Sequence, residues 1–133
     1  MDNEIKDMSA PRKTVMVVDD DKVCQKLIHV CLEKEYNIIP INDGMEAMAY
    51  LNNNTIPDLV LLDMQMPNMD GRQFLRRIRK GNPKLRTIPI IFISSVNSEL
   101  FINSIADLGV LNYIVKPIIG TELKEKVRAV LKE

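Results

Sequence analysis

Short apolar runs alternate with longer stretches of mixed polarity along most of the chain. Four runs are almost wholly apolar, and they span residues 15–18, 59–62, 90–93 and 113–115. Apolar runs this short predict strands, and continuous apolarity is typical of strands buried on both faces of a parallel sheet. A further strand is predicted at 36–41. It contains Pro40, which favours the sheet edge because proline cannot donate to the hydrogen-bonded ladder.

Five helices are predicted between and after these strands. In each, apolar residues recur at spacings of three and four, as expected for a helix with one buried face. The first helix follows an N-cap at Asp21, the third ends at Gly81-Asn82-Pro83, and the fourth spans 98–108 and ends at Gly109. The apolar sets of the other helices are Val23, Leu27, Val30 and Cys31; Met45, Met48 and Leu51; Phe74, Leu75 and Ile78; and Leu123, Val127, Val130 and Leu131.

The alternation of strand and helix predicts an α/β fold. Strand-helix units repeated about five times imply right-handed crossovers and a doubly wound parallel sheet with helices on both faces. The length of 133 residues fits one domain, which we place at 14–133. Residues 1–13 are polar and are expected to form a flexible lead-in.

Composition and charge exclude several classes of function. Lys+Arg and Asp+Glu both number 18, so the overall charge does not favour nucleic acid or a membrane surface. The apolar runs are too short to span a bilayer and no signal peptide is evident, so we expect a cytoplasmic protein. Cys24 and Cys31 lie two helical turns apart, roughly 10 Å, which is too far for a disulfide. The single histidine excludes the common zinc patterns.

Polar residues with useful chemistry follow four of the predicted strands. Asp19 and Asp20 follow the first strand, Asp63 ends the third, Ser94 follows the fourth and Lys116 follows the fifth. The carboxyl ends of parallel strands share one edge of the sheet, where ligands bind. We therefore expect carboxylates, a hydroxyl and a lysine to form one site.

This set of residues favours a metal-assisted reaction at phosphorus. Carboxylates without histidine or cysteine suit a hard cation such as magnesium, which can bridge to phosphate oxygens. The chain has no glycine-rich nucleotide-binding motif, so a phosphate at these acids would need a metal between them. Asp63 could then act as a nucleophile and form an acyl phosphate. Lys116 would add a positive charge, and Ser94 could donate a hydrogen bond to a phosphoryl oxygen.

Over about residues 14–132 the chain resembles the receiver domain of two-component response regulators, of the single-domain chemotaxis-regulator type. The resemblance rests on four motifs in this order: Val17 to Asp21, Asp63 to Gly71, Pro89 to Ser94, and Tyr113 to Pro117. It implies a flavodoxin-like fold with sheet order 2-1-3-4-5. That order places the strand with Pro40 at an edge, as its proline independently suggests.

The resemblance implies a phosphoacceptor switch rather than an enzyme. Asp63 would receive a phosphoryl group from a histidine kinase or a histidine phosphotransfer protein. Asp20, Asp63 and the main-chain carbonyl of Gln65 would bind Mg²⁺, with Mn²⁺ as a substitute, and Asp19 would help mainly through water. No direct contact with nucleic acid or membrane is implied.

The resemblance also implies how the signal leaves the domain. Ser94 would be the switch hydroxyl, Tyr113 the switch aromatic and Lys116 the phosphate-contacting lysine, followed by a cis bond to Pro117. The predicted fourth helix has more apolar residues than one buried face needs: Leu100, Phe101, Ile102, Ile105, Ala106 and Leu108. We expect the fourth helix, fifth strand and fifth helix to form an exposed patch for a downstream target or a second copy.

Alternative interpretations make different demands on the residues. A pseudo-receiver that only binds partners would be expected to lack an acid or the lysine. An aspartyl-phosphate phosphatase of the haloacid dehalogenase type needs an acid at position 65, where Gln65 stands. Proteins that carry phosphate on a histidine such as His29 are helical bundles. The basic run from Arg72 to Arg86 is either a solvated helix face or a docking patch for an acidic partner.

Overall fold

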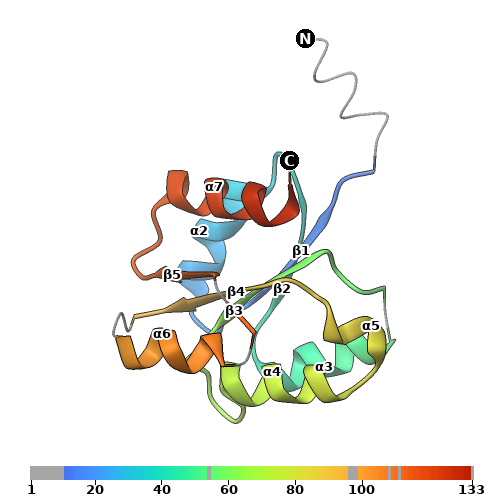
Figure 1. Ribbon diagram of the computed structural model, residues 1–133. Helices are drawn as coiled ribbons and strands as arrows, with labels where there is room; N and C mark the ends of the chain where they lie inside the picture. Colours follow the sequence, from blue (N-terminus) through green and yellow to red (C-terminus); the bar gives the residue numbers. More distant parts are fainter. Residues whose placement is uncertain (1–10, 54, 96–98, 108, 111, 133) are drawn as a thin grey trace.

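The computed structural model describes residues 11–53, 55–95, 99–107, 109, 110 and 112–132. Most of the lead-in predicted at 1–13 lies outside these residues. Strands and helices alternate along the chain (Figure 1). They are β1 (Thr14–Val18), α2 (Lys22–Leu32), β2 (Asn37–Ile41), α3 (Gly44–Asn53), β3 (Leu59–Asp63), α4 (Gly71–Lys80), α5 (Pro83–Arg86), β4 (Ile90–Ser94), α6 (Glu99–Ala106), β5 (Asn112–Val115) and α7 (Gly120–Leu131).

The five strands form one parallel sheet in the order β2-β1-β3-β4-β5, which confirms the predicted topology. β2 lies at an edge, as Pro40 indicated. The register also determines which polar residues meet. Val18 is level with Leu62, so Asp19 follows β1 at the level of Asp63. Ser94 is level with Val115, so Lys116 follows β5 directly beyond that pair.

Helices cover both faces of the sheet (Figure 1). α2 and α7 pack on one face, and α3, α4 and α6 pack on the other. The central strands β3 and β4 are buried along their whole length because both faces are covered. Successive side chains of each strand enter opposite layers of the core: Leu61 packs towards α2 and α7, whereas Leu62 packs towards α3 and α4.

Local sequence signals begin the two helices nearest the predicted site. The Asp21 side chain accepts hydrogen bonds from the backbone N–H groups of Val23 and Cys24, as expected for an N-cap. α4 begins with a capping box, in which Asp70 and Gln73 each accept a bond from the other's backbone N–H. These caps fix the chain directions just after β1 and β3. The predicted cis bond between Lys116 and Pro117 is confirmed.

The predicted buried face of the first helix is wrong. Val23, Leu27 and Val30 are 78%, 40% and 58% exposed, and Cys31 is only partly buried. The face towards the sheet instead carries Cys24, Gln25, Ile28 and Leu32. Both apolar sets have helical spacing, so periodicity alone could not separate them. The buried set includes the larger Ile28 and Leu32, which remove more apolar area from water than the valines would.

The other helices largely follow the predicted pattern. α4 buries Phe74, Leu75 and Ile78 and ends at Gly81, as predicted. α7 buries Leu123, Val127 and Leu131, whereas Val130 is half-buried. In α3 the buried residues are Gly44, Ala47 and Leu51, and the predicted Met45 is exposed instead.

The short helix α5 was not predicted, and it explains part of the basic run. Arg79 donates hydrogen bonds to the backbone carbonyls of Leu85, Arg86 and Ile88 at 3.4, 2.8 and 3.2 Å. It therefore satisfies carbonyls at the end of α5, which leaves Arg79 a structural residue rather than part of a docking patch. Arg76 and its neighbours on the outer face of α4 remain exposed.

The orientation of α2 can be tested by comparing two substitutions. Ile28→Ala should lower the free energy of unfolding by about 2–5 kcal/mol, because it removes a fully buried side chain from the core. Val23→Ala should change it by less than about 0.5 kcal/mol, because Val23 is exposed. Urea unfolding followed by circular dichroism measures both. Equal losses for the two variants would contradict this orientation.

Candidate functional site

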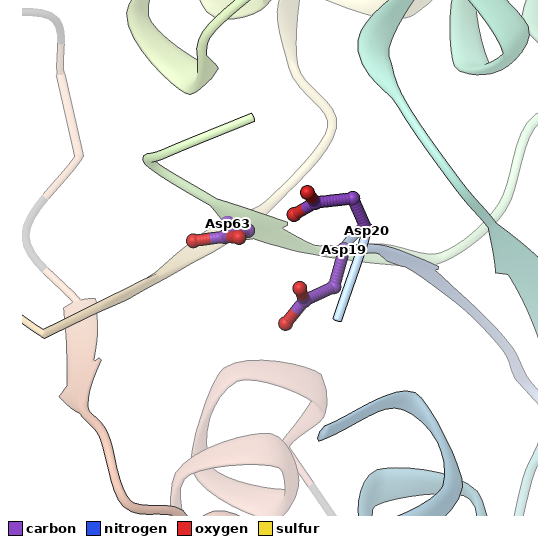
Figure 2. A group of neighbouring side chains, drawn as sticks. All are labelled: Asp19, Asp20 and Asp63. Atoms are coloured by element: carbon purple, nitrogen blue, oxygen red, sulfur yellow. The ribbon is translucent and has the colours of Figure 1, made fainter. Parts of the chain in front are cut away.

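Three carboxylates meet at the ends of two neighbouring strands. Asp19 and Asp20 follow β1, and Asp63 is the last residue of β3 (Figure 2). One carboxylate oxygen from each lies within 4.8 Å of the other two. Asp19 and Asp63 are 0% and 3% exposed, whereas Asp20 is exposed. The site therefore consists of two buried carboxylates, Asp19 and Asp63, next to a third, Asp20, that is exposed to solvent.

Lys116 is the positive charge of this cluster. Its Nζ lies 3.2 Å from Oδ2 of Asp19 and 3.6 Å from Oδ2 of Asp63. Burial alone would lower the pKa of Lys116, but the attraction of Asp19 and Asp63 outweighs burial and raises the pKa. With all acids ionised, three negative charges face one positive charge. The excess suits a divalent cation with oxygen ligands.

The crowding of acids in this cluster changes the pKa of Asp63. Burial and the nearby charge of Asp19 raise the pKa of Asp63 from its usual 3.8 to about 7. The backbone N–H of Gln65, which donates to Oδ1 of Asp63 at 3.2 Å, and the charge of Lys116 oppose this shift without cancelling it. A cation bound among the acids would favour the ionised form of Asp63.

The remaining predicted site residues are Ser94, Gln65 and Tyr113. Ser94 is fully buried at the end of β4, and its carbonyl accepts the backbone N–H of Lys116 at 2.8 Å. Gln65 is exposed two residues after the end of β3. Tyr113 is half-buried on β5, where Lys126 Nζ donates to its carbonyl at 3.0 Å and lies 5.5 Å from its ring centroid. The structure thus groups Ser94 and Lys116 with the acids, whereas Tyr113 lies on the far side of Lys116, where both line a cavity next to α7.

A cavity of about 790 Å³ opens beside the acids. Its walls come from the end of β4, the segment between β3 and α4, and the helices α4 and α6. The lining residues are Asp20, Met64, Gln65, Met66, Pro67, Asp70, Arg72, Ser94, Leu100 and Ser104. The lining is mixed, with polar side chains such as Asp20, Arg72 and Ser94 among apolar ones, and the volume leaves room for a phosphoryl group and a hydrated cation.

Gln25 lies next to the site, although the hydrophobic pattern of the sequence does not single it out. The Gln25 side chain is buried on α2. Its amide donates to backbone carbonyls of β1, of β2 and of the acidic segment, which is the stretch after β1 that carries Asp19 and Asp20. The error in the buried face of α2 concealed it. With Cys24, Ile28 and Leu32 assigned to the core, Gln25 would have been recognised as a buried polar residue next to the acids.

Comparison with known proteins gives a consistent result. Residues 15–128 match the family described as response regulator receiver domain. The response regulator Rcp1 of Synechocystis is 33% identical over 119 residues, which are 83% of this chain and 80% of Rcp1. Chemotaxis protein CheY1 of Helicobacter pylori is 31% identical over 119 residues, or 88% of this chain and 95% of CheY1.

Two further comparisons concern the metal and the length. The crystal structure of the Mn²⁺-bound form of Rcp1 has a TM-score of 0.74 and 29% identity, and the match covers 89% of this chain and 91% of that one. The sensor kinase/phosphatase CqsS of Vibrio cholerae is 33% identical over 91% of this chain, which spans only 18% of CqsS. Among the residues that the structure describes, no helix is long and apolar enough to cross a membrane.

The raised pKa of Asp63 predicts a specific pH dependence of stability in the metal-free protein. Between about pH 4 and pH 7 the folded protein retains a proton on Asp63 that the unfolded chain has released. The free energy of unfolding should therefore fall as pH rises through this range. Asp63→Asn removes the titrating group and should gain stability relative to wild type as pH rises. Urea unfolding at several pH values in a chelator measures the difference, and parallel curves for the two proteins would contradict the prediction.

Proposed function

This chain belongs to the family of response regulator receiver domains, and we propose that it acts as a phosphorylation-activated signalling switch. Members of this family are typically phosphoacceptors rather than enzymes, and they partner with histidine kinases. The proposal is that Asp63 accepts a phosphoryl group from a histidine kinase or a histidine phosphotransfer protein. The observation that carries it is the meeting of Asp63 with Asp19, Asp20 and Lys116 at the sheet edge.

The donor set fits a divalent cation. Asp20, Asp63 and the main-chain carbonyl of Gln65 would hold Mg²⁺, and Asp19 would contribute mainly through water. When bound, the cation would offset the charges of Asp63 and the incoming phosphoryl group. A structure of the relative Rcp1 is described as an Mn²⁺-bound form, which supports binding of a divalent cation by this chain and use of Mn²⁺ as a substitute.

The residues of the chain then have distinct tasks in phosphoryl transfer. An ionised carboxylate oxygen of Asp63 bonds to phosphorus as the bond from phosphorus to the donor's imidazole nitrogen breaks, and the imidazole leaves with that electron pair. Lys116 adds positive charge beside Asp63. Ser94, buried at the rim of the cavity, would donate its hydroxyl proton in a hydrogen bond to a phosphoryl oxygen.

The alternative functions are less well supported. A phosphatase of the haloacid dehalogenase type needs a second acid at position 65, and this chain has Gln65 there. Proteins that carry phosphate on a histidine are helical bundles, whereas this chain folds around a sheet. Its His29 is exposed on α2, where Nε2 lies 3.0 Å from a carboxylate oxygen of Glu33. A pseudo-receiver that only binds partners remains the second candidate, and it makes the opposite prediction in the following experiment. We further propose that residues 14–133 form the receiver unit and that it works in the cytoplasm.

Phosphorylation should occur on Asp63. Incubation with acetyl phosphate and Mg²⁺ should add one phosphoryl group, detected by intact mass, and a chelator should prevent the addition. Asp63→Asn should remain unmodified because its amide is not a nucleophile. A hydroxylamine-labile phosphoryl group on Asp63→Asn would disprove the assignment, and an unmodified wild type would favour the pseudo-receiver.

The exposed apolar face of α2 is suited to docking of the phosphodonor protein. Val23, Leu27 and Val30, with Lys22 and Lys26, line a groove of about 480 Å³. A second cavity of about 370 Å³ shares two of these residues and continues to the site; it is lined by Asp21, Val23, Cys24, Leu27, Ser95, Lys116, Pro117 and Ile118. A donor must bring its histidine to Asp63, so it would cover this adjoining surface. The two lysines favour a helix with an apolar face and acidic flanks.

Substitution of this face should separate protein donors from small ones. The partner in this test is a histidine kinase that phosphorylates the wild type. Leu27→Ser should make phosphotransfer from this kinase slower by about tenfold or more, because it removes an apolar contact at the interface. Phosphorylation by acetyl phosphate should change by less than about twofold, since Leu27 is not one of the reacting groups. Time courses with radiolabelled phosphate measure both reactions. Equal slowing with both donors would contradict donor docking on α2.

The output surface predicted at the fourth helix, fifth strand and fifth helix corresponds to α6, β5 and α7. Leu100 is 84% exposed on α6, whereas Ile105 is buried and Ile102 half-buried. The side chain of Phe101 and all of Leu108 lie outside the described residues. On the α7 side a cavity of about 470 Å³ is lined by Tyr113, Val115, Lys116, Pro117, Ile119, Glu122 and Lys126. We propose that phosphorylation changes binding of a target or a second copy at this surface.

Activation should therefore be detectable far from Asp63. Beryllium fluoride, a phosphoryl mimic, should shift backbone amide resonances of α6 and Tyr113 as well as those of the site. Analytical ultracentrifugation, with and without the mimic, should show a change in self-association or in binding to a target. Shifts confined to the surroundings of Asp63, with no change in association, would contradict the proposed output surface.

A further inference from the structure

Gln25 occupies an unusual position for a polar side chain. It is only 8% exposed, on the face of α2 that packs against the sheet. Its Nε2 lies 2.7 Å from the carbonyl oxygen of Val17, 3.1 Å from that of Asp19 and 2.8 Å from that of Ile41. All three neighbours are acceptors, so the NH₂ group of the amide must face them and share its two protons among them.

These three carbonyls lie where the strand ladder ends. The pairing of β1 with β2 ends at Val18 and Ile41, so the segment that carries Asp19 and Asp20 lies beyond the paired strand residues. One backbone bond, from the N–H of Asp19 to the carbonyl of Ile41 at 3.0 Å, continues past this point. Gln25 adds a side-chain connection between the end of β1, the acidic segment and the end of β2.

The acidic segment needs such a connection because its charges repel. Asp19, Asp20 and Asp63 each place an oxygen within 4.8 Å of the others, and moving the segment away from β3 would relieve the repulsion. Lys116 links the side chains of Asp19 and Asp63, but the bond from the Asp21 N–H to Asp19 Oδ1, at 2.9 Å, lies within the segment and does not tie its backbone to a strand. The amide of Gln25 joins the backbone of the segment to α2, to β1 and to β2, and β1 is in turn paired with β3.

The Oε1 atom of the Gln25 amide indicates that this residue acts here through the NH₂ donors. Among the described residues, Oε1 of Gln25 is buried and has no hydrogen-bond partner. A buried acceptor without a partner is unfavourable, so packing alone would be served better by an apolar side chain of the same shape. The three accepting carbonyls provide a reason for an amide at this position.

We propose that Gln25 is a positioning residue of the metal site. It holds the backbone of Asp19, and with it the neighbouring Asp20, close to Asp63 before a cation arrives. Binding of the cation then does not have to order this segment, which increases affinity. The inference rests on the proposed function in one respect: the site must bind a divalent cation for phosphoryl transfer.

The test is metal binding by the full chain without any phosphodonor. Gln25→Met keeps the shape of the side chain and removes both donor protons. It should raise the dissociation constant for Mn²⁺, measured by electron paramagnetic resonance, and for Mg²⁺, measured by calorimetry, by about tenfold or more. Asp20→Asn is the positive control, and Ile28→Val, a buried change on the same face of α2, should alter affinity by less than about twofold.

A second measurement separates positioning from a general loss of stability. In phosphorylation by acetyl phosphate, Gln25→Met should need about tenfold more Mg²⁺ for half-maximal rate. At saturating Mg²⁺ its rate should return to within about twofold of wild type, because no reacting group has changed. If Gln25→Met does not fold, Gln25→Asn takes its place; its amide falls one methylene short of the carbonyls, and it should show a smaller weakening in the same direction.

Each outcome has a distinct meaning. An unchanged metal affinity in a folded Gln25→Met, or Gln25→Asn in its place, would overturn the positioning role. So would a rate that stays low at saturating Mg²⁺. Failure of the wild type to accept a phosphoryl group would count against the proposed function, whereas the comparison of dissociation constants would still decide the role of Gln25.

Discussion

Asp19, Asp20 and Asp63 repel one another electrostatically, and the fold must hold them together against this repulsion. Two of these carboxylates are buried, and a single lysine offsets part of their charge. Such a cluster persists only where the backbone that carries it is held firmly. The parallel register provides this, since it brings the ends of β1, β3 and β5 to one edge with Lys116 over the acids. The same repulsion is the reason to propose a divalent cation at the site.

The close approach of α4 to β3 completes one wall of the site. A Cβ on Gly71 would lie 2.8 Å from the carbonyl oxygen of Asp63 and 3.0 Å from Cα of Met64. Only glycine allows the helix to begin so near the strand that ends in Asp63. The capping box of Asp70 and Gln73 then fixes the end of the segment that connects β3 to α4. Short-range rules at this turn therefore determine the shape of the cavity.

On the other side of the cavity, α6 is attached less extensively. Ile105 is the one residue of this helix that is fully buried among its described side chains. A hydrogen bond of 2.7 Å from Arg72 of α4 to the hydroxyl of Ser104 connects the two helices across the cavity. A helix with few buried contacts can shift at low cost. It follows the strand that ends in Ser94, so a change at the site could move it, in agreement with the proposed output surface.

The order of elements, the parallel sheet and the residues at its edge could all be predicted from the amino-acid pattern. Apolar runs that end in Asp63, Ser94 and Lys116 sufficed for this, because strand ends and sheet edge follow from chain order and handedness. Periodicity could not decide which of two apolar stripes of α2 faces the sheet, because both have helical spacing. Tertiary packing chose Ile28 and Leu32, left Val23 and Leu27 at the surface beside the site, and turned Gln25 inward. The raised pKa of Asp63 also depended on the fold, because burial and the distance to Asp19 exist only once the strands have paired.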